Sequence, residues 1–173
     1  HDLPLEFPKK VKKQLDQIPN EVKEKDSSGR EDFRDLRTVT IDGEDAKDLD
    51  DAVSIERTDN GYRLGVHIAD VSYYVKEKSP LDVEALKRGC SVYLVDRVIP
   101  MLPPKLSNGI CSLNPRMDRL TMSVIIDFDE NSNVKNYKIT PGIIKTCERM
   151  TYTEVNKILE DKDPKVIKRF DYL

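Results

Sequence analysis

Alternating apolar and polar positions in the middle of the chain predict an antiparallel sheet. Residues 38–41 and 51–56 are short runs rich in β-branched side chains, and residues 120–128 alternate over a longer stretch. Asn60-Gly61 follows the second run, and this dipeptide favours a tight hairpin because both residues tolerate positive φ. We therefore expect residues 53–57 to pair with residues 62–68.

Further along, shorter signals predict a second hairpin and three helices. Residues 134–144 should return along 120–128, with Pro141 marking an edge or a bulge. Ser79-Pro80 is typical of a helix start, and that helix should stop at Gly89. The other expected elements are a helix over 11–18, a strand over 91–95, an ordered loop over 101–114, and a helix over 155–159 behind a Thr151/Glu154 capping box.

These elements predict an α+β fold, with a mixed, mostly antiparallel twisted sheet and helices packed on it. A chain of 173 residues can bury one modest core, so a second large domain is not expected. Residues 1–36 are polar, with a flexible run at 25–30, and we interpret them as a linker. Residues 37–173 would form the folded part.

Composition excludes several protein classes. No apolar run approaches the ~20 residues of a membrane span, and the first residues lack the basic and apolar regions of a signal peptide. Three cysteines without a CxxC pair suit neither a zinc site nor a disulfide framework. We therefore expect reduced, partly buried thiols in a cytoplasmic protein that does not contact membranes.

Negative charge is concentrated in one stretch. Residues 38–60 carry eight acidic and two basic side chains, whereas residues 1–37 are neutral and residues 61–173 carry three excess positive charges. A nucleic-acid-binding domain is usually basic, and this chain, with a pI near 5.5, is not. A metal ion held between carboxylates and phosphate is one way for an acidic patch to bind nucleic acid.

Four aspartates, Asp42, Asp48, Asp50 and Asp51, lie between the first two predicted strands. Like charges this close repel by roughly 1 kcal/mol per pair even in water. Mg²⁺ suits such oxygen ligands, and two ions about 3.5–4 Å apart can activate water against a phosphodiester. The alternatives are a solvated loop whose aspartates cap turns and an EF-hand. The EF-hand fails, because Val53 would occupy its glycine position and Asp59 its final glutamate position.

The loop and several later blocks resemble one known family. Residues 40–52, TIDGEDAKDLDDA, are similar to the signature loop of the catalytic (RNB) domain of the ribonuclease II and ribonuclease R family. The resemblance covers roughly residues 5–160, and the sequence of residues 67–72 is more similar to ribonuclease R than to ribonuclease II. The other similar blocks, in order, are residues 64–72, 91–94, 98–103 and 106–114.

This resemblance implies a processive, hydrolytic 3′–5′ exoribonuclease that requires Mg²⁺, with Mn²⁺ as the alternative ion, and releases nucleoside 5′-monophosphates. It implies that Asp42, Asp48 and Asp51 hold metal directly or through water, and that Asp50 is the residue most needed for chemistry. Tyr93 aligns with the tyrosine that packs against the nucleotide at the RNA 3′ end. The implied partner is therefore the 3′ end of single-stranded RNA.

The family's catalytic domain is about twice as long as the matching part of this chain. It later supplies an arginine and a glutamate, and it is flanked by cold-shock and S1 RNA-binding domains. The resemblance thus implies that residues 37–173 are the N-terminal part of a catalytic domain and that residues 1–36 follow a missing cold-shock domain. A fragment of this kind would be weakly active or inactive alone and would leave apolar faces uncovered.

Two other functions stay open from the sequence. One is a non-hydrolytic RNA-binding or divalent-metal-binding module, and the other is a protein-interaction domain whose acidic loop repels nucleic acid. We interpret Glu44 and Asp45 as loop charges and His67 as a structural or supporting residue. Tyr73 and Tyr74 could serve the core or RNA. The candidate phosphate contacts are Arg88, Arg97, Arg116 and Arg119.

Overall fold

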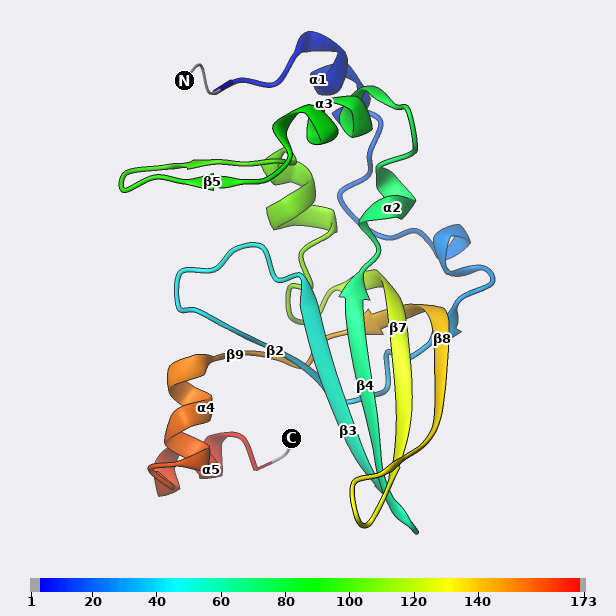
Figure 1. Ribbon diagram of the computed structural model, residues 1–173, viewed down its shortest axis with the longest axis vertical. Coiled ribbons are helices and arrows are strands. Elements are labelled where there is room, and N and C mark those ends of the chain that lie inside the picture. Colours follow the sequence, from blue (N-terminus) through cyan, green and yellow to red (C-terminus); the bar gives the residue numbers. More distant parts are fainter. Residues whose placement is uncertain (1–3, 172–173) are drawn as a thin grey trace.

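The computed structural model describes residues 4–171 and shows a twisted seven-stranded sheet with several helices gathered at one end (Figure 1). The strand order is β1-β8-β7-β4-β3-β2-β9. These strands are β1 (Glu31–Asp32), β2 (Thr38–Asp42), β3 (Asp51–Thr58), β4 (Gly61–Ala69), β7 (Asp118–Asp129), β8 (Val134–Lys145) and β9 (Glu148–Thr151). Strands β5 (Val92–Tyr93) and β6 (Val98–Ile99) form a separate hairpin.

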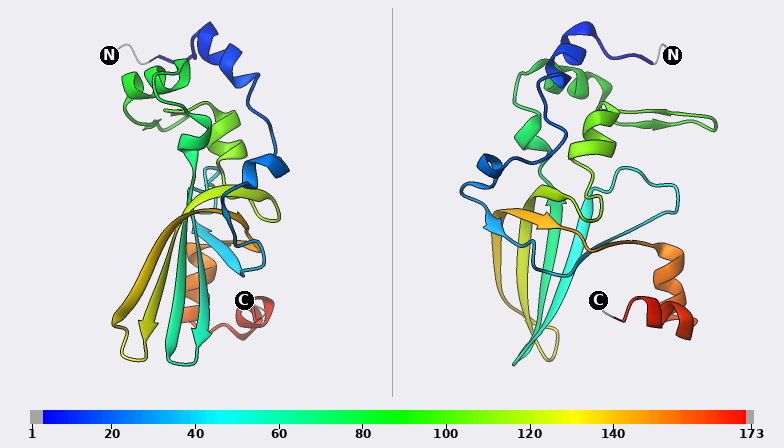
Figure 2. Two further views of the ribbon diagram at one scale, coloured as in Figure 1. Left: turned by 90° about the vertical axis from the view of Figure 1, so that its right-hand side faces the viewer. Right: turned by 180° about the vertical axis from the view of Figure 1, so that it is seen from behind.

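The sheet is mixed, mostly antiparallel and curled. Pairs β1–β8 and β2–β9 are parallel, and the pairs between them are antiparallel. Residues 31–42 supply β1 and β2, while residues 134–151 supply β8 and β9. Residues 31–42 therefore pair with β8 through β1 and with β9 through β2. The sheet curls around an interior (Figure 2).

Most helices lie beyond one end of the sheet. That group contains α1 (Lys9–Leu15), α2 (Val71–Tyr74), α3 (Pro80–Arg88) and the helical segment η2 (Lys105–Ile110). The short helix η1 (Glu24–Ser27) precedes β1, and α4 (Tyr152–Leu159) and α5 (Pro164–Arg169) follow β9. No helix within residues 4–171 is long and apolar enough to cross a membrane.

Two apolar clusters form the core. One joins the helices to the sheet end, and its buried members include Val11, Leu81, Leu106 and Ile143. The other lies inside the curled sheet around Leu49, Ala52, Leu113 and Ile144. Residues 1–36, interpreted above as a linker, contribute to both clusters, because Val11, Ile18 and Phe33 are buried.

The predicted fold class is confirmed, as are its local signals. Strands β3 and β4 pair in the expected hairpin, with Thr58 opposite Gly61. The Ser79 hydroxyl accepts the Asp82 N–H at the start of α3, and Gly89 ends that helix at a φ of 77°. The Thr151/Glu154 capping box opens α4.

Some element predictions were wrong. The segment expected as a loop over 101–114 contains η2, because Leu106 and Ile110 are one helical turn apart and both are buried. The strand expected over 91–95 is only two residues long, and α1 ends at Leu15 instead of residue 18. Elements β1, β6, β9, η1, α2 and α5 were not predicted from the sequence. All three cysteines are free as expected, although Cys90 is exposed.

A hydrogen-bonded row of polar side chains, the inner polar row, crosses the interior of the sheet. It consists of Ser54, His67, Ser123 and Thr121. The His67 ring lies 3.1 Å from the Ser54 Oγ through Nε2 and 2.8 Å from the Ser123 Oγ through Nδ1. His67 is fully buried, and burial lowers its pKa from 6.5 to about 4. The interior thus keeps a neutral imidazole with both nitrogens satisfied.

The inner polar row also depends on a glycine. A Cβ on Gly142 would lie 2.8 Å from the Ser123 Oγ and 2.9 Å from both the Thr121 Oγ1 and a ring carbon of Phe33. We predict that Gly142→Ala lowers the unfolding free energy by about 1–3 kcal/mol, because it overpacks this interior. Denaturant unfolding measures the change. Gly43→Ala, whose Cβ meets no atom within 4 Å, is the matched control and should be nearly neutral.

Burial of His67 also predicts a pH dependence of stability. Its pKa is about 4 in the folded state, against an ordinary value of 6.5, so the unfolded state binds the proton more tightly. The unfolding free energy should therefore fall as pH drops from about 7 toward about 4, by up to ~3 kcal/mol from this group. His67→Gln should lack this part of the dependence. Parallel stability-pH curves for the two proteins would contradict the assignment.

Candidate active site

The four aspartates lie around one loop at one end of the sheet. Asp42 is the last residue of β2 and Asp51 the first of β3, and Asp48 and Asp50 lie on the loop between them. Each of the other three carboxylates raises the pKa of Asp50, so the four groups share one electrostatic neighbourhood. The fold therefore brings together all four acidic residues that the sequence singled out.

Leu49 anchors the loop to the core. Its side chain is 1% exposed. Its N–H donates to the Ser112 Oγ at 3.1 Å, and its carbonyl accepts the Leu113 N–H at 2.8 Å. The Ser112 hydroxyl donates in turn to the Lys47 carbonyl at 2.9 Å. Because Leu49 is fixed in the core, the positions of its two neighbours, Asp48 and Asp50, are constrained.

Arg149 holds the other side of the loop and was missed by the sequence analysis. It lies on β9, which pairs with β2 in parallel. One guanidinium nitrogen donates to the Gly43 carbonyl at 2.9 Å and to the Glu44 carbonyl at 2.7 Å. The Glu44 carboxylate accepts the Thr153 hydroxyl, which fits the interpretation of Glu44 as a loop charge.

Two of the aspartates have raised pKa values. Partial burial and the Asp51 and Asp48 carboxylates raise the pKa of Asp42, while Arg149 lowers it. Asp50 is exposed as a residue, yet desolvation of its carboxyl and the other three aspartates raise its pKa. Both shifts have the same cause: negative charge is gathered where water is partly excluded.

The structure also brings Tyr93 to this loop. Tyr93 lies on β5 with 67% of its surface exposed, and its hydroxyl donates to an Asp48 carboxylate oxygen at 3.3 Å. The Asp48 charge is the largest cause of the raised pKa of Tyr93. A hollow of about 970 Å³, lined by residues that include Asp48, Tyr93 and Arg149, lies between the loop and the β5–β6 hairpin. A second hollow, of about 380 Å³, is lined by both Asp48 and Asp50.

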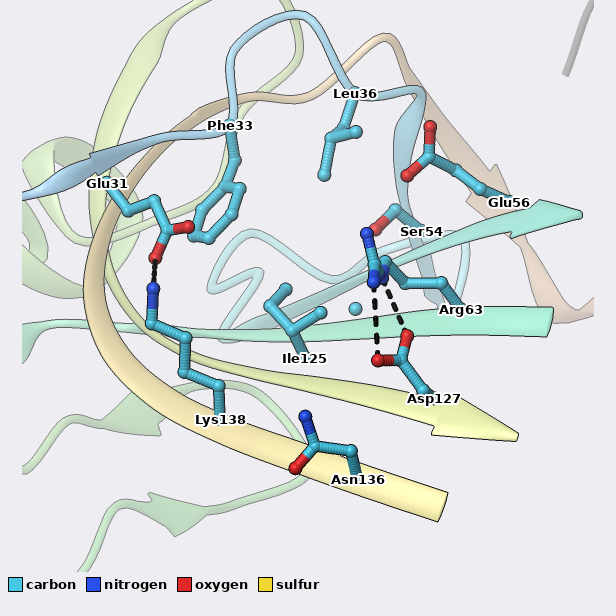
Figure 3. Close-up of a pocket in the computed structure, with 11 residues that line it drawn as sticks. Glu31, Phe33, Leu36, Ser54, Glu56, Arg63, Ile125, Asp127, Asn136 and Lys138 are labelled. Atoms are coloured by element: carbon cyan, nitrogen blue, oxygen red, sulfur yellow. Dashed lines mark hydrogen bonds and ion pairs between the residues drawn. The ribbon is translucent and has the colours of Figure 1, made fainter. Parts of the chain in front are cut away.

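A third hollow, of about 290 Å³, is lined by residues of β1, β3, β4, β7 and β8, among them Ser54 (Figure 3). Its charged side chains are largely paired with one another. Arg63 binds Asp127 through two hydrogen bonds of 2.7 and 3.2 Å, and Lys138 contacts Glu31 at 2.7 Å. None of the four aspartates lines it. This hollow is therefore separate from the candidate active site.

Several other candidate residues have structural roles. Arg88 is buried against Glu84 and donates to the Pro100 and Glu6 carbonyls, and Arg119 donates to the Ser112, Asp118 and Gly109 carbonyls. Their expected phosphate contacts are wrong for this structure, because these carbonyls already occupy their N–H groups.

Two tyrosines and the histidine are likewise parts of the fold. Tyr74 is buried in the first core cluster, and the Tyr73 hydroxyl donates to Asp26 at 2.7 Å. Asp26 and Tyr73 thereby join η1 to α2. His67 belongs to the inner polar row, so its interpretation as a structural residue is consistent with its position.

The chemistry of the loop fits a hard divalent cation. One carboxylate oxygen of Asp42 is buried without a hydrogen-bond partner, and a buried anionic oxygen of this kind needs a cation or a donor. Within residues 4–171, however, no three acidic, histidine or cysteine side chains converge closely enough to enclose an ion. A Mg²⁺ ion does not require such a cluster, because it keeps several waters and uses one or two carboxylates.

The RNB domain matches residues 30–170. The chain belongs to the RNB-domain family. Among curated RNB relatives, Ribonuclease R 1 of Lactococcus lactis is 58% identical over 159 residues, which cover 91% of this chain and 20% of that protein. Ribonuclease R of Thermotoga maritima is 57% identical over 174 residues, covering 99% and 24%. The chain thus spans about a fifth to a quarter of the length of these relatives.

Solved structures show the same RNB fold. Mycoplasma genitalium RNase R in complex with double-stranded RNA matches with a TM-score of 0.85 and 36% identity, covering 95% of this chain and 30% of that one. Yeast Ssd1, a pseudonuclease, matches with a TM-score of 0.74 and 22% identity, covering 82% and 18%. The second likeness concerns the fold alone, so a shared fold does not by itself establish the chemistry of the loop.

The position of Arg149 predicts a measurable effect on Asp42. We expect Arg149→Gln to raise the pKa of the Asp42 carboxyl further, because a neighbouring positive charge that lowers this pKa is lost. Carboxyl-carbon NMR titration without added metal measures the shift. Arg97→Gln is the matched control, because Arg97 pairs with its neighbour Asp96 at an exposed position. An Asp42 pKa that is the same in both variants would contradict the role of Arg149.

Proposed function

We propose that this chain is the part of a hydrolytic 3′–5′ exoribonuclease that carries its metal-binding carboxylates. The full protein would act processively on the 3′ end of single-stranded RNA in the cytoplasm and release nucleoside 5′-monophosphates. The observation that carries the proposal is the joint placement of Asp42, Asp48, Asp50 and Asp51, with one Asp42 oxygen buried and unpartnered. Membership of the RNB-domain family and its ribonuclease R relatives support the substrate class.

The proposed roles follow from position and charge. Asp42, Asp48 and Asp51 would hold Mg²⁺, or Mn²⁺, directly or through water. When bound, the metal would neutralise the phosphate and lower the pKa of a water molecule whose attack on phosphorus would displace the 3′ oxygen of the preceding nucleotide. Asp50 would orient that water and accept its proton, a role that suits a carboxyl whose pKa is raised. Phosphate approach to such an acidic loop would require this metal charge.

Tyr93 would bind the nucleotide at the 3′ end. Its ring is largely exposed beside Asp48, and a flat exposed ring can stack on any base or ribose without selecting sequence. The hollow between the loop and the β5–β6 hairpin would then receive the terminal nucleotide. Leu49 and Arg149 would act indirectly, by keeping the loop in place.

Asp50→Asn in the full-length protein tests the central role. We expect mononucleotide release to fall on the order of 10²–10⁴-fold, the usual range for a lost general base. RNA affinity should change little, because an anionic side chain contributes no attraction to phosphate. Asp59→Asn, an exposed acidic residue in the β3–β4 turn that lines none of the three hollows, is the matched control and should retain activity. Release near the parent rate by Asp50→Asn would overturn the assignment.

Metal removal separates hydrolysis from simple binding. With labelled RNA and the full-length protein, Mg²⁺ should yield mononucleotides, and EDTA should abolish them. RNA that stays intact and bound under both conditions would instead favour a non-hydrolytic RNA-binding module. Products that form equally in EDTA would contradict the metal role of the loop.

A further inference from the structure

Lys47 is the one basic residue between residues 42 and 51, a segment that also holds six acidic residues. A lysine with so many acidic neighbours is expected to pair with a carboxylate, because opposite charges attract strongly at contact distance. Among the described residues, however, Lys47 forms no ion pair and no side-chain hydrogen bond, and it is exposed. Its ammonium group is therefore available to a ligand.

The backbone of Lys47, in contrast to its side chain, is held by the fold. Its carbonyl accepts the Ser112 hydroxyl at 2.9 Å, and that hydroxyl oxygen accepts the Leu49 N–H at 3.1 Å. Just before it, the Ala46 N–H donates to the Gly43 carbonyl at 3.1 Å. Ser112 is fully buried, so the core determines where the Lys47 side chain leaves the loop.

Lys47 lines the hollow of about 970 Å³ between the acidic loop and the β5–β6 hairpin, together with Asp48 and Tyr93. The loop and the hairpin project from the same side of the molecule (Figures 1 and 2). Among the described residues that line this hollow, the basic ones are Lys47 and Arg149. Arg149 donates from one nitrogen to two loop carbonyls, and its Nε is buried. Lys47 is therefore the cation that an anion entering the hollow can contact.

A simpler role for Lys47 would be to offset the repulsion among the aspartates. The charges argue against this role. Arg149 is the cation that lowers the pKa of Asp42, and the charges that shift the pKa of Asp50 are those of the other three aspartates. Lys47 belongs to neither group, and it lies within ion-pairing distance of no carboxylate in the described part of the chain. Its charge is thus not used by the loop itself.

We propose that the Lys47 ammonium group binds the phosphate of the 3′-terminal nucleotide in this hollow. The inference rests on the proposed function, which places that nucleotide against Tyr93 and its phosphate beside the acidic loop. A lysine suits this contact, because its flexible stem carries a compact charge with three donors. Hydrolysis leaves the phosphate on the released nucleotide as a monoester, which carries about −1.5 to −2 charges at neutral pH. Lys47 consequently holds the mononucleotide product as well as the substrate, whatever its base.

Equilibrium titration of the full-length protein with adenosine 5′-monophosphate, at Mg²⁺ concentrations that saturate each variant, tests this contact. We expect Lys47→Gln to weaken binding of the monophosphate about tenfold or more, because a hydrogen bond to a charged group is lost. Adenosine, which lacks the phosphate, should bind the parent and the variant equally. Arg57→Gln is the matched control and should change neither affinity, because Arg57 is the other basic residue of residues 38–60 and lines none of the three hollows.

A conservative variant separates the charge of Lys47 from its effect on loop shape. Lys47→Arg should keep most of the affinity for the monophosphate, because it keeps the positive charge. An unchanged affinity in Lys47→Gln, or equal losses for the monophosphate and adenosine, would overturn the proposal. This titration involves no turnover. Failure of the full-length protein to release mononucleotides would therefore count against the proposed function, whereas an unchanged monophosphate affinity would count against the Lys47 contact alone.

RNA with one neutral linkage identifies which phosphate Lys47 contacts. Affinities are measured with and without Lys47→Gln in full-length protein that carries Asp50→Asn, which blocks turnover. A methylphosphonate at the last linkage should weaken binding to the protein with Lys47 and have little further effect once Lys47 is replaced, because both changes remove the same contact. A methylphosphonate several nucleotides upstream should weaken both proteins equally. A Lys47→Gln effect that is undiminished with the neutral last linkage would overturn the assignment.

Discussion

The candidate active site depends on the burial of Leu49 in the middle of an acidic loop. Four carboxylates in one neighbourhood repel one another by roughly 1 kcal/mol per pair even at the dielectric constant of water. Burying one leucine side chain contributes about 1.5–3 kcal/mol, and Leu49 is additionally fixed by hydrogen bonds to Ser112 and Leu113. Four carboxylates form six pairs, so the burial of Leu49 offsets only part of this repulsion. The loop is a place where the fold holds charges together that would otherwise separate.

Local signals explain which parts of this structure could be predicted from the sequence. Asn60-Gly61 defines the β3–β4 hairpin, Ser79-Pro80 defines the start of α3, and Thr151 with Glu154 defines the start of α4. In each case the stabilising contact joins residues at most a few positions apart. The four aspartates were predictable for a related reason, because they lie within ten residues of one another and follow a family pattern.

The parts that escaped prediction depend on distant partners. Strand β9 exists because it pairs with β2, more than a hundred residues earlier, and its own four residues carry little strand signal. Arg149 contacts the Gly43 and Glu44 carbonyls, and no motif connects an arginine to backbone groups so far away. Segment η2 was not predicted because Pro103 and Pro104, just before it, suggested a loop. Its Leu106 and Ile110 are nevertheless both buried. In all three cases tertiary contacts outweigh local preference.

The alternating pattern alone could not predict which side of each strand faces the interior. Alternation predicts a strand with one apolar and one polar side, but it does not say which side faces inward. Here the interior holds His67 and its hydroxyl partners, while Ile55 and Ile139 point outward. Asp51 shares a row with Ile68 and Met122 on that outward side, so the apolar rows end at the acidic loop.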